Sequence, residues 1–175
     1  MFRVIEEVVL SLDKKQTYHG TRRKLKGEYL NPSRACWTSR DTGRVVCERD
    51  SLVFATKDKV IAIAFAAGLD DFAMFANPFV LFVHNSEEKK LDSPGYLLSL
   101  DKKDFSDFNE LTNEYTTDKP VKIQAQERIV PRKKLEKMGV EIYSIPDTEP
   151  FPTCIEDVKK LEKKLGLVLT GDVND

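Results

Sequence analysis

One continuous apolar run, residues 78–84, constrains the fold of this chain more than any other feature. The run has the length of a strand and lacks the polar alternation of a strand that faces water on one side. It is typical of a central strand covered on both faces, so the chain must supply packing layers on either side of it. His84 ends the run, and we interpret it as a histidine with satisfied hydrogen bonds rather than as a catalytic group.

The remaining periodicity predicts further strands and three helices in an irregular order. The strands are expected at 17–21, 52–55, 96–100, 121–129 and 140–145, and the helices at 57–67, 131–138 and 155–165. Since the helices do not alternate regularly with the strands, this order favours an α+β fold over a doubly wound sheet. The length of 175 residues suits one domain, and we assign residues 1–175 to a single domain.

Local signals place several helix ends. Thr56 is expected to cap the first helix, and residues 70–76 are expected to add a short helical turn after it. Thr153 and Glu156 have the spacing of a capping box at the start of the last helix. The polar segment 22–50 is expected to consist mainly of loops, and within it Trp37 either anchors a lid on the core or stacks on a ligand.

Composition indicates a chain without a membrane segment. Charged residues make up 33% of it, and no apolar run approaches the roughly 18 residues of a membrane helix. Residues 1–12 lack a signal-peptide pattern, so we expect a cytoplasmic protein. The three cysteines are an odd set without a C-x-x-C pair. They indicate neither a disulfide framework nor a zinc site, and free thiols are expected.

Charge is unevenly distributed along the chain. Residues 1–60 hold 13 Lys and Arg against 8 Asp and Glu, although the whole chain has a net charge of −1. This basic half, which includes Arg23 and Arg34, is either a solvated charged surface or a face for a phosphate-bearing ligand or nucleic acid.

Three segments are candidates for one pocket. The first, residues 16–21, carries His19 followed at once by Gly20. The second is the 52–56 segment with its apolar helix, and the third is the 122–127 segment. Alternation along the third segment places Glu127 on the apolar face, where a carboxylate is costly unless it is paired, hydrogen-bonded or functional. A β-bulge would instead turn Glu127 outward.

Several common sites are excluded by motif. The chain has no G-x-G-x-x-G after a strand, no P-loop, no H-E-x-x-H and no G-x-S-x-G. With two histidines 65 positions apart, a metal site built from several histidines is excluded within one chain, and no metal is expected. A nucleotide that binds here does so without a Rossmann fingerprint.

The three segments together resemble the ADP-ribosyltransferase fold. The resemblance rests on Tyr18-His19-Gly20-Thr21, then Val53-Phe54-Ala55-Thr56 with the helix after it, then the strand that carries Glu127. It is to the branch with a His, an aromatic residue and a Glu, which includes diphtheria-type toxins and poly(ADP-ribose) polymerases. The tRNA 2′-phosphotransferases share the His-Gly-Thr. The match covers the order and spacing of the segments from about residue 17 to residue 129.

The resemblance implies split β-sheets with a few flanking helices, which hold NAD as a co-substrate for ADP-ribosyl transfer to a protein or nucleic-acid acceptor. By the same resemblance His19 bonds a ribose hydroxyl, the Gly20 backbone approaches the nicotinamide amide, and Glu127 stabilises the oxocarbenium-like transition state. Such a carboxylate lowers the barrier because positive charge develops at the sugar carbon. Arg23 or Arg34 is expected at the pyrophosphate, which favours fork-shaped donors. The expected NAD-binding residues are Tyr18, His19, Gly20, Thr21, Arg23, Arg34, Phe54 and Thr56.

The chain departs from the family pattern at one position. Val53 stands where the family usually has a Tyr, just before the Phe-Ala pair. Two alternatives to ADP-ribosyl transfer therefore stay open. One is a domain that binds NAD, ADP-ribose or an RNA end without turnover, and the other is removal of a 2′-phosphate from RNA with NAD.

Overall fold

The structure is a computed structural model, and it describes residues 15–34, 36–38, 44–47, 49–76, 79–110 and 113–166. The expectations for residues 1–12 and for the side chain of Trp37 lie outside the described residues. Within the described helices, none is long and apolar enough to cross a membrane.

Seven strands form one antiparallel sheet in the order β2-β11-β8-β1-β5-β10-β9. In chain order they are β1 (Gln16–Thr21), β2 (Tyr29–Leu30), β5 (Val53–Thr56), β8 (Gly95–Asp101), β9 (Asp107–Asn109), β10 (Glu114–Thr117) and β11 (Val121–Ile129). A second sheet has the order β12-β7-β6 and contains β6 (Ala73–Ala76), β7 (Phe79–His84) and β12 (Glu141–Ile145). The strands β3 (Cys36–Thr38) and β4 (Val45–Cys47) pair with each other. Mixed, mostly antiparallel sheets with few helices confirm the α+β class.

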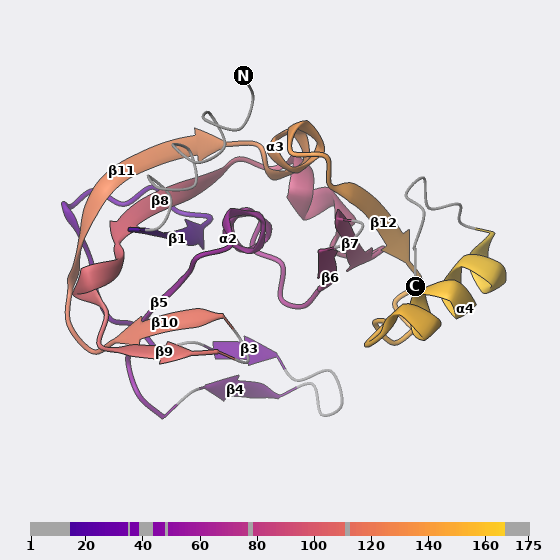
Figure 1. Cartoon of the computed structure of the whole chain (residues 1–175), viewed down its shortest axis with the longest axis horizontal. Helices are drawn as coiled ribbons and strands as arrows, with labels where there is room; N and C mark the ends of the chain where they lie inside the picture. The colour runs from indigo at the N-terminus through magenta and orange to yellow at the C-terminus, as the bar shows by residue number, and fades with distance from the viewer. Residues whose placement is uncertain are drawn as a thin grey trace, which may run out of the picture.

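Helix α2 (Lys59–Ala66) lies at the centre of the molecule, and the seven-stranded sheet curls around it in Figure 1. The other helices are α3 (Pro131–Lys137) and α4 (Ile155–Leu165), and two short 3₁₀ segments are η1 (Glu88–Asp92) and η2 (Lys102–Asp104). α4 lies beside the second sheet, at the opposite end of the molecule from β11 (Figure 1).

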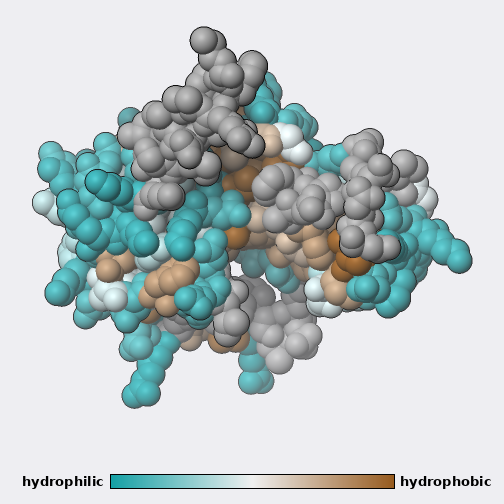
Figure 2. Space-filling model, viewed as in Figure 1, coloured by the Kyte–Doolittle hydropathy of each residue, from teal (hydrophilic) through white to brown (hydrophobic). Residues whose placement is uncertain are grey.

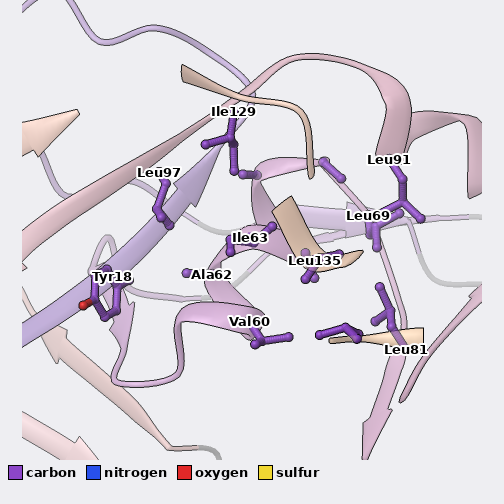
Figure 3. Close-up of a cluster of buried hydrophobic side chains, with 14 of the residues drawn as sticks. Tyr18, Val60, Ala62, Ile63, Leu69, Leu81, Leu91, Leu97, Ile129 and Leu135 are labelled. Atoms are coloured by element: carbon purple, nitrogen blue, oxygen red, sulfur yellow. The ribbon is translucent and has the colours of Figure 1, made fainter. Parts of the chain in front are cut away.

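The central position of α2 follows from its composition. Val60, Ala62 and Ile63 are buried along it, so the helix is apolar on nearly every side and needs neighbours all round. Figure 3 shows these side chains between Tyr18 and Leu97 of the sheet and the cluster of Leu81, Leu91 and Leu135.

α2 approaches the sheet so closely that glycines are needed beneath it. A Cβ on Gly20 would lie 1.8 Å from the carbonyl oxygen of Ala62, and one on Gly95 would lie 2.1 Å from that of Ala66. Both contacts are with helix backbone, which cannot move aside as a flexible side chain could. The Gly20 expected at the nicotinamide amide is therefore required by helix packing in its own right.

β7 confirms the expectation of a central strand covered on both faces. Leu81 and Val83 join the core around α2, whereas Val80 and Phe82 join a second cluster with Val158 of α4. His84 Nε2 donates a hydrogen bond to the Glu149 carbonyl over 2.9 Å.

Three local expectations are corrected. The cap of α2 is Asp58, whose carboxylate accepts the N–H groups of Val60 and Ile61, while Thr56 Oγ1 accepts the Asp58 N–H over 3.0 Å. An acceptor at this position typically stabilises a helix by about 1 kcal/mol. Residues 70–76 do not add a helical turn; β6 lies there and pairs with β7.

The capping box before α4 is the third correction. Thr153 does not act with Glu156. Instead the Asp157 carboxylate accepts from both the N–H and the hydroxyl of Thr153, at 3.3 and 2.9 Å. The helix still begins and ends where expected, with Gly166 in the left-handed conformation at φ 66°.

Candidate functional site

A cavity of about 460 Å³ lies between α2 and the part of the sheet where β1 and β5 meet. Its volume is within the range of pockets that hold small-molecule ligands. Figure 2 shows hydrophobic side chains gathered near the centre of one face, with a hollow beside them, at the place that α2 occupies in Figure 1. The lining residues come from β1, β3, β5, α2, the loop after α2, and β10.

The cavity opens because β1 and β5 separate. Tyr18 and Thr56 are paired across the two strands. One residue further along β1, the His19 side chain bonds to β5 in place of the β1 backbone. Its ring nitrogen Nδ1 lies 2.7 Å from the Phe54 carbonyl oxygen. The three expected residues Tyr18, His19 and Phe54 thus meet at this point and line the cavity.

His19 is held in a defined protonation state. A carbonyl oxygen only accepts, so Nδ1 carries the proton and Nε2 remains the acceptor of the ring. Burial lowers the pKa of His19 below its usual range, and the bond to Phe54 opposes this in part. The imidazole is therefore neutral at neutral pH, with Nε2 able to accept a hydroxyl proton.

Glu114 is a functional candidate that sequence reasoning missed. Its partner across the sheet is Thr56, whose partner in turn is Tyr18, so the three residues form one row over β1, β5 and β10. Directly opposed residues share a face of a sheet, and all three line the cavity. Glu114 therefore supplies a carboxylate to the cavity that His19 also lines, although His19, which follows Tyr18 in β1, alternates to the opposite face of the sheet.

A weak sequence signal for Glu114 exists. Tyr115 and Thr117 are buried, so the strand alternates and places Glu114 on the other face from them. The four-residue length hides this period, and the pairing with β5 is a non-local contact that no local pattern encodes.

The structure does not bring Glu127 to the cavity. Its side chain is 50% exposed, and its carboxylate pairs with Lys134 of α3 at 2.6 Å. The pairing register of β11 with β8 shifts between Ile123 and Ala125. This shift is the β-bulge expected as the alternative for this strand.

The bulge moves the second half of β11 to the other face of the sheet. Val121 and Ile123 pack with Leu98 and Leu100, but Ile129 packs in the core around α2. Glu127 then lies on the same face of the sheet as its cross-strand partner Leu97. Its carboxylate pairs there with the ammonium group of Lys134 in α3. Glu127 therefore does not line the cavity that His19 lines.

Three expected binding residues also lie apart from the cavity wall. Thr21, Arg23 and Arg34 do not contribute to the lining. Thr21 Oγ1 accepts the Arg23 N–H over 3.2 Å, and Arg23 and Arg34 are exposed. By contrast Gly20 and Thr56 line the cavity as expected.

The helix and the loop after it add two further groups. Phe65 of α2 is 44% exposed, lines the cavity and packs edge-on against Phe72. Asp70 lines the far side, where its carboxylate pairs with Lys90 at 3.0 Å and its N–H donates to Glu87. The cavity therefore combines aromatic rings with two carboxylates, and none of the described residues that line it is Lys or Arg.

The cysteine expectation is corrected at the cavity wall. Cys36 and Cys47 form a disulfide between directly opposed positions of β3 and β4, and Cys36 lines the cavity. Cys154 is free and exposed. Disulfides are rare in cytosolic proteins, so this pairing does not fit the expectation of a cytoplasmic location as free thiols would.

No protein-family model matches this chain significantly, and neither does a curated protein or a solved structure.

Proposed function

We propose that this chain binds NAD in the cavity and transfers ADP-ribose to a protein or nucleic-acid acceptor, with His19 and Glu114 as the reactive pair. The observation that carries the proposal is that both residues line one cavity, together with Tyr18, Gly20 and Thr56. Four of these five belong to the segments that resemble ADP-ribosyltransferases. Glu114 takes the role first expected of Glu127.

The charge of the cavity supports this substrate. The nicotinamide ring of NAD is a cation, and the cavity offers it aromatic faces from Phe54 and Phe65 with carboxylates nearby. As nicotinamide leaves, positive charge moves to the ribose carbon. A fixed carboxylate such as Glu114 stabilises that charge more than it stabilises the neutral sugar, which lowers the barrier.

His19 supports the ribose part of the proposal. Its neutral Nε2 accepts a hydrogen bond from a ribose hydroxyl, while the Phe54 carbonyl fixes the tautomer through Nδ1. A protonated imidazole could not accept this bond and would place a second cation beside the nicotinamide.

The proposal places the pyrophosphate of NAD outside the cavity, since the Glu114 carboxylate repels phosphate and the Asp70 carboxylate is already paired with Lys90. Arg34 remains the better of the two expected partners, because it is two residues from Cys36 in the cavity wall. Arg23 remains a prediction that depends on the direction in which NAD leaves the cavity.

Binding without turnover is the second candidate, and Val53 favours it. The Val53 side chain is buried in the core behind the cavity rather than on its wall, so it cannot replace the family's tyrosine. Stacking on the nicotinamide then falls to the aromatic rings of the lining, Tyr18, Phe54 and Phe65.

The test is nicotinamide release from labelled NAD by four proteins: wild type, Glu114→Gln, Glu127→Gln and His19→Ala. We expect Glu114→Gln to lose about 100-fold or more in rate, as when one preorganised electrostatic group is removed. Glu127→Gln is the matched control, since it removes an exposed carboxylate of the same kind, and it should keep the wild-type rate.

Equal rates for Glu114→Gln and wild type would overturn the assignment of Glu114. If wild type releases no nicotinamide but binds NAD, and His19→Ala does not bind it, the second candidate replaces the first. Loss of a 2′-phosphate from an RNA substrate in the presence of NAD would instead indicate a phosphotransferase.

A further inference from the structure

The Cys36–Cys47 disulfide ties together β3 and β4, the strand pair of the cavity wall that belongs to neither larger sheet. Among the described strands, β3 and β4 pair only with each other. The segments before β3 and after β4 are joined to each other by a single described β-bridge. In it Ser33 and Leu52 exchange backbone hydrogen bonds at 3.1 Å.

Little else among the described contacts holds this hairpin in place. Val45 and Val46 are exposed, at 70% and 39%, and Cys36 and Cys47 are exposed as well. None of these four side chains belongs to a described core cluster. A two-stranded hairpin without a packed face is marginally stable in water, so the covalent link is the main constraint on the geometry of β3 and β4.

Cys36 connects this constraint to the ligand site, because it lines the cavity that His19 and Glu114 also line. The position of β3 therefore sets the shape of one cavity wall. An exposed disulfide at such a place is also open to attack by a thiolate from solution.

We propose that Cys36–Cys47 is a redox-sensitive site that controls ligand affinity in the cavity, a role that rests on the proposed NAD binding. In the disulfide form the hairpin is fixed and the wall is complete. A dithiol reductant attacks one sulfur through its thiolate and forms a mixed disulfide, and its second thiolate then displaces the remaining protein sulfur. Two electrons pass to the protein, two protons complete the Cys36 and Cys47 thiols, and the dithiol becomes its cyclic disulfide.

Reduction then lowers the affinity of the cavity for NAD. Without the disulfide, β3 and β4 adopt the conformation that binds NAD only part of the time. Coupling between two sites in a protein typically changes affinity by a factor of about 5 to 150. We therefore expect NAD to bind at least about fivefold more weakly to the reduced protein than to the oxidised one.

The experiment uses the full chain in three forms: wild type, Cys154→Ser, and Cys36→Ser/Cys47→Ser. NAD affinity is measured by calorimetry before and after dithiothreitol, and again after reoxidation. Wild type and Cys154→Ser should lose affinity on reduction and regain it on reoxidation. The double variant should bind weakly in both conditions, and reduced wild type provides the same test if that variant does not fold.

A second measurement needs no ligand. Trp37 is the single tryptophan of the chain, and its backbone lies in β3 next to Cys36. We expect the emission of wild type to change reversibly on reduction, with no change in the double variant. Alkylation should label one thiol in the oxidised chain and all three cysteines in the reduced one.

Equal NAD affinity and unchanged Trp37 emission after complete reduction would overturn the redox proposal, as would three alkylated thiols in the oxidised chain. If NAD binds neither form while emission changes reversibly, the proposed function fails and the redox-sensitive hairpin stands.

Discussion

His19 is the residue at which the chemistry of the cavity can be tested most directly. Burial lowers the pKa of its imidazole below the usual 6.5, against the opposing effect of the Phe54 carbonyl. We therefore expect NMR titration to give His19 a pKa below 6.5. The chain has two histidines, so a His84→Gln variant assigns the signals. A His19 pKa at or above 6.5 would show that the ring is not desolvated and would remove the neutral acceptor from the proposed mechanism.

The same shift makes stability depend on pH. Between the lowered folded-state pKa and 6.5, the unfolded chain binds a proton at His19 that the folded chain does not. The contribution of His19 to stability is therefore complete above pH 6.5 and is lost as the pH falls toward the folded-state value. Urea unfolding of wild type and His19→Gln between pH 5 and 8 should show their stability difference shrinking at acidic pH.

The candidate site could be predicted only in part from single residues. His19 and Gly20 could be found, because a histidine followed by a glycine in a short strand is a local pattern. Glu127 was placed wrongly because one bulged residue reverses the face of every later side chain in a strand. Glu114 could not be found from its neighbours, since its role depends on pairing with β5, about 60 positions away.

At the scale of elements, the contact between α2 and β1 decides whether the cavity can exist. Gly20→Ala would place a Cβ 1.8 Å from the Ala62 carbonyl oxygen, and backbone on both sides would have to move. We expect a loss of about 1–3 kcal/mol or more in the free energy of unfolding, as for an overpacked core. Urea unfolding measures this loss.

Gly27→Ala is the matched control for this substitution. The nearest atom to a Cβ at Gly27 is the Tyr29 backbone nitrogen at 3.9 Å, so the same chemical change makes only an ordinary van der Waals contact there. Its stability should stay within about 0.5 kcal/mol of wild type. Equal effects at the two glycines would mean that α2 does not press on β1 as closely as the structure has it.

Element type followed from the sequence for the long elements, and for only some of the short ones. The strand β11 and the helix α4 have nine and eleven residues, and both were predicted. The four-residue β6 was expected as a helical turn, because Ala and Met favour helices and only pairing with β7 makes it a strand. The order of the seven-stranded sheet lies beyond local pattern altogether.

At the scale of the whole molecule, β7 joins two hydrophobic cores. Leu81 and Val83 point into the core around α2, and Val80 and Phe82 point into the core beneath α4. Alternate side chains of one strand therefore stabilise both, and neither core can lose β7 without exposing apolar surface in the other. This arrangement favours a single cooperative unit and agrees with the assignment of one domain, which remains a prediction.

Phe82→Ala tests that cooperativity. Phe82 is 1% exposed and contacts Phe75 and Tyr143 through its ring, so truncation should cost about 3–5 kcal/mol. Met138→Ala, at a side chain 39% exposed, should change stability by about 0.5 kcal/mol or less. If the cores unfold together, helical circular dichroism and Trp37 fluorescence, which reports from β3, should give one coincident urea transition that moves to lower urea in Phe82→Ala. Two separated transitions, with only the circular dichroism signal displaced, would mean that the second sheet and α4 unfold independently of the cavity.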